Sequence, residues 1–269
     1  MRSPGIEPGS QMETDITCLI MQRYMKVSPE VISLIKQGIS VNKIRKITGR
    51  AKSTIYYHYK KIRGKKQKPT IIKFDSDNEL GEFLGIFAGD GSVNLAGGYH
   101  YQVRVHLGYY EKQYVTALQN KFVEWFSKKP QVHLRNYKGR LSRIDLYYSS
   151  KPLYLFLKSH LFWEGKKTYS VKLRDFDLKK KKFNIGFLRG LIDTDGNFYK
   201  PKRRLSFSTV SKGLAKQAYE IFKHDLGIEP KIFIYKKMKR ADLYTICVHG
   251  DNAINAIELI KPRNQNKRY

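Results

Sequence analysis

Three aspartates are the first candidates for chemistry, because each lies where an apolar, glycine-spaced segment ends. Asp90 closes one segment, and Asp193 and Asp195 close another. A carboxylate is unfavourable at the C-terminal end of a helix, which already carries about half a negative charge. A divalent cation would reverse this, and oxygen ligands without nearby cysteine or histidine indicate Mg²⁺ or Mn²⁺. We expect Asp90 and Asp195 to share about two or three such ions, with Gly89 and Thr194 as further ligands.

Glycines four residues apart indicate how the acids would meet. They occur once in each apolar segment, as Gly85 with Gly89 and as Gly186 with Gly190. A glycine inside a helix costs roughly 0.5–1 kcal/mol relative to alanine, so its repetition needs a reason. Small residues at this spacing let two helices approach closely. We expect the two helices to pack through these glycines and bring the last acid of each segment together.

Two structural explanations compete with metal binding. An EF-hand calcium loop beginning at Asp193 would need glycine at its sixth position and glutamate at its twelfth. The chain has Phe198 and Arg204 there, which excludes such a loop. Asp-Gly pairs also favour tight turns, and such a turn is compatible with a bound metal. A purely structural role of the acids is the remaining alternative.

The charge of the chain indicates a polyanionic partner. The sequence has 52 Lys and Arg against 23 Asp and Glu, a formal net charge of +29. Such a field attracts nucleic acid above all. A lysine-rich, heat-adapted surface is the alternative, but acidic residues would then be numerous too. We expect no membrane association, since no lipid anchor is recognised and no apolar run approaches the roughly 20 residues of a membrane span.

The chain ends and cysteines favour an intracellular protein. Cys18 and Cys247 make neither a disulfide framework nor a zinc site. The start, MRSPGIEPGSQMET, contains no apolar stretch of signal-peptide length. Residues 1–26 are predicted to be a disordered leader, with Met12 as an alternative start. We expect a location in the cytoplasm, or on the nucleoid in a prokaryote.

An internal repeat relates two parts of the chain. The matching segments are 79–93 with 184–198, 144–157 with 244–257, and 165–169 with 265–269. The first match aligns Asp90 with Asp195, and the last aligns Lys167 with Lys267. Matches this spread out predict two copies of one unit of about 100 residues. Each copy reads as helix, strand, strand, helix, strand, strand, helix, which predicts an α+β fold with a pseudo-twofold axis.

Alternation of apolar and polar residues along 101–107 predicts a strand with one solvent-exposed, basic face, here called the wet face. Val103, Val105 and Leu107 would point to the core. The opposite face would carry Gln102, Arg104 and His106, and the second copy would place Lys202, Arg204 and Ser206 at the same positions. The other residues expected to contact DNA from such strands are His133, Arg135, Arg143 and Lys231. A basic two-stranded ribbon fits a major groove, whereas a plain half-exposed sheet is the alternative.

Residues 28–62 read as three short helices around glycine turns. This segment resembles a helix-turn-helix of the resolvase type. Its third helix would offer DNA the residues Lys52, Ser53, Thr54, Tyr57 and His58. A three-helix interaction module is the alternative. The predicted division is a leader at 1–26, this domain at 27–62, a basic linker at 63–75, and the two repeat halves at 76–180 and 181–269.

The motif sequences carry a family resemblance. FLRGLIDTDG at 187–196 and FLGIFAGDG at 83–91 resemble two copies of the LAGLIDADG motif. Residues 79–269 as a whole resemble a single-chain, two-motif LAGLIDADG homing endonuclease. The first motif departs from the second, with Ala88 where Asp193 stands. The resemblance implies a tandem αββαββα core whose antiparallel sheets form a saddle over DNA.

The resemblance also implies roles for single residues. The last acid of each motif, Asp90 and Asp195, would bind the shared metals for cleavage of both strands of a long duplex. A basic residue late in each half would act beside them, and the repeat nominates Lys167 and Lys267, with Lys166 as a competitor. The family generally places a polar side chain on the second strand near the metals, where this chain has Gly108 and Ser208.

Three functions remain open from the sequence. The favoured one is an intron-encoded, monomeric, Mg²⁺-dependent endonuclease that acts on double-stranded DNA. A DNA-binding regulator with weak or lost cleavage is the second. An RNA maturase acting on its own intron is the third. An intein origin is disfavoured because the C-terminal His-Asn of a splicing end is missing.

Overall fold

The chain forms two compact units in a computed structural model. The structure describes residues 28–64, 70–97, 100–236 and 241–264. The two units divide between Lys68 and Pro69, inside the predicted linker. The predicted leader and Lys267 lie outside the described residues. Within the described ranges, no helix combines the length and the apolar character needed to cross a membrane.

The N-terminal unit consists of three helices, α2 (Pro29–Lys36), α3 (Val41–Thr48) and α4 (Lys52–Arg63). Ser40 caps α3 by accepting from the Lys43 amide, and Gly49 ends it in the left-handed region at a φ of 64°. The small core consists of Val31, Ile35, Val41, Ile44 and Ile55. Tyr56, the neighbour of Ile55 on α4, is exposed. Neighbouring residues on a helix point to different faces, so Ile55 packs inward and Tyr56 does not.

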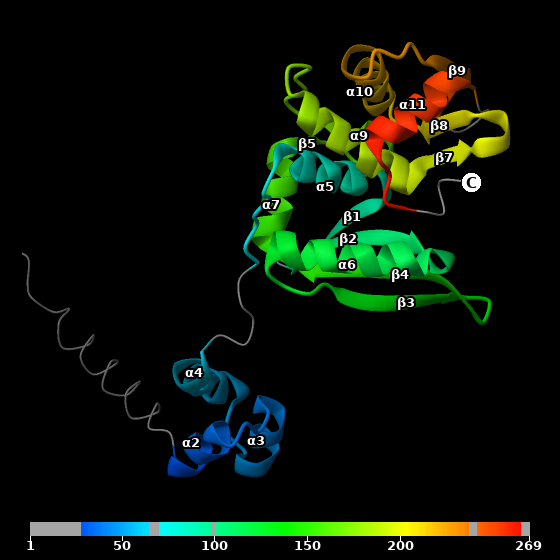
Figure 1. Cartoon of the computed structure of the whole chain (residues 1–269). Helices are drawn as coiled ribbons and strands as arrows, with labels where there is room; N and C mark the ends of the chain where they lie inside the picture. The colour runs from blue at the N-terminus through cyan, green and yellow to red at the C-terminus, as the bar shows by residue number, and fades with distance from the viewer. Residues whose placement is uncertain (1–27, 65–69, 98–99, 237–240, 265–269) are drawn as a thin grey trace, which may run out of the picture. The chain divides into compact units, whose positions relative to one another are not determined.

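The larger unit contains the two predicted copies (Figure 1). The first copy consists of α5 (Asp77–Asp90), β1 (Gly91–Ala96), β2 (His100–Gly108), η1 (Tyr109–Glu111), α6 (Lys112–Phe126), β3 (Gln131–Tyr137), β4 (Arg140–Ser149) and α7 (Lys151–His160). A short connection follows, with β5 (Leu161–Phe162), α8 (Lys167–Ser170) and β6 (Lys172–Leu173). The second copy consists of α9 (Lys181–Asp195), β7 (Gly196–Tyr199), η2 (Lys200–Lys202), β8 (Arg204–Thr209), α10 (Lys212–Glu220), η3 (Ile221–Asp225), β9 (Lys231–Tyr235), β10 (Leu243–His249) and α11 (Asp251–Ile260). The predicted α+β order is confirmed.

Each copy builds one antiparallel sheet with its first hairpin joined to its second. The strand orders are β1-β2-β4-β3 and β7-β8-β10-β9. The alternation predicted for β2 is confirmed, because Val103, Val105 and Leu107 are buried. The apolar stripe of α6 is buried in the same core, which is continuous across both copies. This arrangement leaves the opposite face of each sheet for polar side chains.

Strand register corrects the predicted matching of the two wet faces. Gly91 pairs with Val105 in one sheet, and its counterpart Gly196 pairs with Phe207 in the other. Val105 therefore corresponds to Phe207. It follows that Arg104 corresponds to Ser206, and His106 to Ser208, each two residues from the predicted match.

The same register corrects two further expectations. Gln102 corresponds to Arg204, whereas Lys202 lies in η2 before the strand begins. Gly108 corresponds to Val210, so Gly108 and Ser208 are not equivalent positions. The two copies also differ in length, and part of this difference lies in the turn that follows β2. The shift is an even number of residues, so each predicted side chain still points to the expected face.

Candidate active site

The two motif helices, α5 and α9, are in backbone contact. Figure 1 shows them side by side, each continuing directly into the first strand of its own sheet. A methyl group at Gly85 would collide with the Phe187 carbonyl, and one at Gly190 would collide with the Glu82 carbonyl and the Ile86 amide. The glycines that meet partner backbone in this way are Gly81, Gly85, Gly186 and Gly190, whereas Gly89 meets the side chains of Thr194 and Asp195. Gly81 extends the predicted set by one turn.

The C-terminal ends of these helices bring the two motif acids to one place. A methyl group at Gly89 would lie 2.9 Å from Asp195 Oδ2, so this carboxylate lies over the residue preceding Asp90. Burial lowers the pKa of Lys167 and both acids oppose this shift, which places them within electrostatic reach of one amino group. The Thr194 hydroxyl donates to Gly190 and Leu191 carbonyls of its own helix, at 3.0 and 3.1 Å. A metal contact of Thr194 would therefore use its carbonyl oxygen.

Lys167 lies beside these acids, at the start of α8. Its ammonium group donates to the carbonyls of Phe87, Ala88 and Gly89, at 2.8, 2.5 and 2.9 Å. A cation is favourable at a helix C-terminus. Burial lowers the pKa of Lys167 to about 8, although Asp195 and Asp90 oppose the shift. At neutral pH the group remains mostly charged.

The neighbouring candidate, Lys166, is the exposed N-cap of α8. Its position gives no contact comparable with the three carbonyls that hold the Lys167 ammonium. Lys267, the predicted counterpart in the second copy, lies outside the described residues.

The donors at this point suit a hard divalent cation. Among the described residues, no group of three or more His, Cys, Asp and Glu side chains converges as a metal site. Mg²⁺, however, is commonly held by one or two carboxylates together with substrate phosphates rather than by a complete protein cage. Asp90 and Asp195 offer such a partial set.

Asp193 serves the fold behind the site. Its side chain is fully buried, and Oδ1 accepts from the Asn264 backbone amide at 2.8 Å. Asn264 Nδ2 donates to the Asp193 carbonyl and to Glu111, at 2.9 and 2.7 Å. Burial raises the pKa of Asp193 to about 7. This acid thus ties the segment after α11 to the motif helices, a role the sequence did not reveal.

Gly108 ends β2 where a polar side chain was expected. A methyl group there would collide with the ring of Tyr110 and lie 3.1 Å from Glu111 Oε2. Tyr110 is 74% exposed, and its pKa is raised by Glu111 first, then by burial and by Asp90. The space beside Gly108 is therefore taken by an aromatic ring close to Asp90. Sequence reasoning missed Tyr110 because it follows the strand instead of lying on it.

The wet face of the first sheet is organised by a buried acid. The Asp145 cluster, defined as Asp145 with Arg104, His106, Arg135 and Arg143, spans β2, β3 and β4. Asp145 Oδ1 meets His106 Nδ1 and Arg143 Nε at 2.8 Å each, and Oδ2 meets Arg135 Nε at 3.2 Å. Burial raises the Asp145 pKa, but hydrogen bonds from His106 and Arg135 hold it below its ordinary value.

Asp145 was missed as a functional residue in the sequence. The available signal was an acid that alternates with Arg143 and Tyr147 on an otherwise basic strand face. His106 also meets the hydroxyl of Ser92 at 2.7 Å, which links the cluster to β1. Gln102, a further predicted contact residue, accepts from Arg104 at 2.6 Å. His133 lies opposite Asp145 in the ladder and is exposed.

The wet face of the second sheet has a different composition. Ser208 and Thr245 hydrogen-bond across β8 and β10 at 2.9 Å. Lys231 lies at the start of β9, and Phe233 and Tyr235 follow on the same face, both exposed. Hydroxyl and aromatic groups thus dominate where the first sheet carries arginines.

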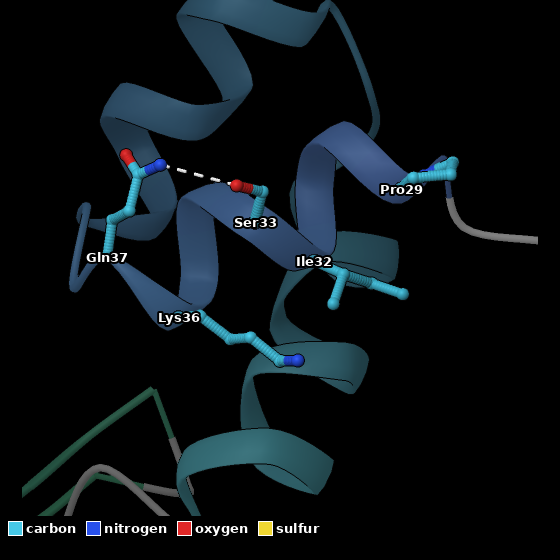
Figure 2. A pocket seen from close by; sticks show the side chains of 5 residues that line it. All are labelled: Pro29, Ile32, Ser33, Lys36 and Gln37. Carbon is cyan, nitrogen blue, oxygen red and sulfur yellow. Dashed lines mark hydrogen bonds between the residues drawn. The ribbon is translucent and has the colours of Figure 1, made fainter.

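The remaining predicted contact residues lie in the N-terminal unit. Lys52, Ser53 and Tyr57 are exposed on α4, and Thr54 and His58 are partly buried. Burial first, and Lys61 second, lower the pKa of His58. Figure 2 shows a shallow pocket along α2, where Gln37 donates to Ser33 at 3.2 Å. The residues that line this pocket are Pro29, Ile32, Ser33, Lys36 and Gln37, so they include no acid and no histidine.

Comparison with known proteins identifies the architecture. Residues 182–261 match the family described as LAGLIDADG-like domain. A variant of the homing endonuclease I-DmoI, in complex with its target DNA in the presence of Mg, superposes with a TM-score of 0.50 at 18% identity, covering 69% of this chain and 96% of that one. A second I-DmoI variant, in complex with its target DNA in the presence of Mn, gives 0.50 at 18% identity, with 70% and 96% coverage.

A third similar structure is the N-terminal LAGLIDADG domain of DUF199/WhiA, with a TM-score of 0.47 at 14% identity, covering 71% of this chain and 85% of that one. No curated protein matches the sequence significantly. At such identities the I-DmoI likeness establishes the fold alone. The predicted LAGLIDADG resemblance and its tandem fold are confirmed.

Proposed function

Because the chain carries a LAGLIDADG-like domain in the tandem fold of a homing endonuclease, we propose that it cleaves both strands of duplex DNA at a specific site, by divalent-metal-dependent hydrolysis. One observation carries the proposal. Asp90 and Asp195 lie at neighbouring ends of two helices in backbone contact, with the Lys167 ammonium held beside them. Two acids and a buried cation at one point are more than a stable fold needs.

Each residue of the proposed site has a separate role in metal or phosphate binding. Asp90 and Asp195 would hold the metal, with the carbonyl oxygens of Gly89 and Thr194 as further donors. Without metal, the Gly89 carbonyl accepts from the Lys167 ammonium. A divalent ion, when bound, supplies a polarised water and stabilises charge on the phosphate. Lys167 balances the negative helix end at neutral pH and adds positive potential near the phosphate. Lys267 is the proposed counterpart for the other strand.

The two wet sheet faces and the positive charge account for the partner. Their cationic side chains contact phosphates and bases of duplex DNA, and the exposed residues of α4 add contacts from the N-terminal unit. One chain supplies both acids, so a monomer contains a complete site. The metal, the ion number, the monomeric state and the intron-encoded origin are parts of this proposal.

Nuclease activity can be tested with Asp195→Asn and Asp90→Asn. A target selected from a randomised duplex library is incubated with each variant and Mg²⁺, and linear product is measured. Each change should reduce cleavage by at least about a hundredfold, because a neutral amide is a poor ligand for Mg²⁺. Binding of the same duplex without metal should persist. Asp251→Asn, at an exposed acid in α11 that pairs with Arg203, is the matched control and should cut normally.

A DNA-binding protein without cleavage is the second candidate. The observation that favours it is the crowded position at Gly108, which leaves no strand side chain to orient water. Site-specific binding by the unaltered chain with no Mg²⁺- or Mn²⁺-dependent cutting would replace the nuclease proposal with this one. Stronger binding to its own intron RNA than to the duplex would favour the maturase.

A further inference from the structure

Asp145 is an unusual residue for a DNA-contacting face. It is the only acidic residue in β1 to β4, and its side chain has no exposed surface. A buried carboxylate is strongly unfavourable unless it is paired and hydrogen-bonded. The Asp145 cluster supplies these partners from three strands. The acid therefore depends on the arginines, and the arginines are held in place by the acid.

The contacts leave the outer ends of two arginines available. Arg135 and Arg143 meet Asp145 through Nε, so this contact does not use their terminal NH2 groups. Their side chains are 42% and 44% exposed. A guanidinium held at Nε by a charged hydrogen bond is restricted in orientation, which reduces the entropy lost when it binds a second partner.

The cluster keeps a positive charge despite its acid. Three arginines surround one carboxylate, so the arginines outnumber the negative charge. Burial is the main cause that lowers the pKa of His106, with Asp145 opposing it and Arg143 and Arg104 adding to it. A neutral His106 donates from Nδ1 to Asp145 and accepts at Nε2 from the Ser92 hydroxyl, and it adds no charge to the cluster. The face thus attracts DNA while presenting its donors in fixed positions.

The second sheet has none of these groups at the corresponding positions. The strand registers replace Arg104, His106, Asp145, Arg135 and Arg143 with Ser206, Ser208, Thr245, Tyr235 and Leu243. Every charged or imidazole group becomes a hydroxyl, aromatic or aliphatic one. The two sheets share a backbone but offer different chemistry to a bound duplex.

We propose that Asp145 is a positioning residue that aims Arg135 and Arg143 at guanines in one half-site, so that the guanine contacts of the two half-sites differ. The two terminal NH2 groups of an arginine recognise the O6 and N7 acceptors of guanine, whereas apolar groups suit the methyl group of thymine and hydroxyl groups have no strong base preference. Arg204 and Lys231 also lie on the second wet face, outside these five positions. The half-site under β7–β10 is therefore expected to have a weaker guanine preference than the half-site under β1–β4. The inference rests on the proposed use of the sheet faces for DNA binding.

Binding selection without cutting tests the asymmetry. The full chain is incubated with a randomised duplex library in the presence of EDTA, and the bound sequences are recovered and read. Guanine should be preferred by about 10–100-fold at two or more positions on one side of the site only. Equal guanine preference on both sides, or none on either, would overturn the inference.

The role of Asp145 is tested with Asp145→Asn in the same selection. The guanine preference of that half-site should fall by about tenfold or more, because the arginines lose their fixed orientation. The opposite half-site should keep its preference. Affinity for non-specific DNA should be maintained or increased, since an acid has been removed from a basic face. A purely structural residue would instead lower both half-site preferences together.

Asp251→Asn is the matched control, because it removes an exposed acid of α11 that pairs with Arg203, outside the Asp145 cluster. It should leave both half-sites unchanged. If Asp145→Asn does not fold, as judged by thermal unfolding, Arg143→Lys decides the question. Lysine keeps the positive charge but lacks the planar guanidinium group with its two terminal NH2 donors. This variant should therefore have a lower guanine preference, while its affinity for non-specific DNA persists. Retained preference in that variant contradicts the proposed role.

The two proposals fail separately. An asymmetric, guanine-containing site that is bound but not cut with Mg²⁺ refutes the nuclease and leaves the inference standing. A site that is cut but has no asymmetric guanine requirement refutes the inference and leaves the nuclease standing.

Discussion

The surroundings of Asp90 and Asp195 differ although the two acids end equivalent helices. At the end of α5, a buried ammonium donates to three carbonyls and the Tyr110 ring lies close by. At the end of α9, Asp193 is buried and anchors the Asn264 segment. The tandem repeat therefore preserves the backbone frame, while the groups that tune each acid have diverged.

The chemical surroundings of Asp90 are therefore not a copy of those of Asp195. The α5 end gains positive charge from Lys167, whereas the α9 end contains a second, buried carboxyl group. The two sheets also differ, because the positions of the Asp145 cluster hold hydroxyl, aromatic or aliphatic groups in the second sheet. The two copies are most alike where backbone touches backbone, at the equivalent glycines Gly85 and Gly190.

The largest expected effect comes from breaking that shared contact with Gly190→Ala. The added methyl group would collide with backbone atoms of Glu82 and Ile86, which cannot move without separating the helices. We expect a loss of about 3 kcal/mol or more in the free energy of unfolding, measured by urea denaturation.

Gly213→Ala, on α10, is the control for that change. Its added methyl group would meet only the flexible side chain of Lys172, at 3.1 Å. Stability should change by less than about 1 kcal/mol, or increase, since alanine favours helix. Similar stability in the two variants would show that the helices are not held in backbone contact.

The pH dependence of stability tests the burial of Asp193 near the end of α9. A folded-state pKa of about 7, against an ordinary value of 3.8, means that the folded chain holds a proton that the unfolded chain releases. Stability from this group is full below about pH 4 and is lost as pH rises through about 7. In metal-free protein, Asp193→Asn should remove this decline and raise stability at pH 8 by roughly 2–4 kcal/mol.

Thermal unfolding across pH 4 to 8 measures the effect, and the difference between variant and parent isolates Asp193. Asp251→Asn, at an exposed carboxyl group, should keep the parent profile. A decline that persists in Asp193→Asn would assign it to other groups.

Lys167→Met tests the role of the buried ammonium group beside Asp90. Methionine occupies a similar volume but leaves three carbonyls of α5 without their donor and removes the cation beside both acids. Under the proposed function, cleavage should fall by about a hundredfold while DNA binding changes little. Lys166→Met is the matched control at the exposed neighbour and should cut within about threefold of the parent. Equal loss in both variants would remove Lys167 from the site.

The smallest effect is expected from Tyr110→Phe. This change keeps the ring that fills the space beside Gly108 and removes only the hydroxyl group near Asp90. If the hydroxyl orients water in place of the missing strand side chain, single-turnover cleavage should slow by about 3–10-fold with unchanged binding. An unchanged rate would limit Tyr110 to a packing role.

Several elements were predictable because their signals are local. The alternation of Val103, Val105 and Leu107 predicted the buried face of β2, and the glycine spacing predicted close helix packing. The motif segments also predicted where the helices end. The Asp145 cluster was not predictable, because Arg104, Arg135 and Asp145 come together only through strand pairing across three strands. The matching of Ser208 with Gly108 failed for the same reason.

From the sequence alone we could predict the repeat, the order of helices and strands, and the face on which each strand residue lies. The acids at the ends of the motif helices were predictable in the same way. These properties follow from periodicity, composition and similarity between neighbouring residues. The tertiary structure alone decided which residues are partners: Lys167 with the carbonyls of α5, Asp193 with Asn264, and Asp145 with its arginines. A shift of two residues in a strand leaves every side chain on the same face but changes every partner, so pattern fixes the face and only packing fixes the pair.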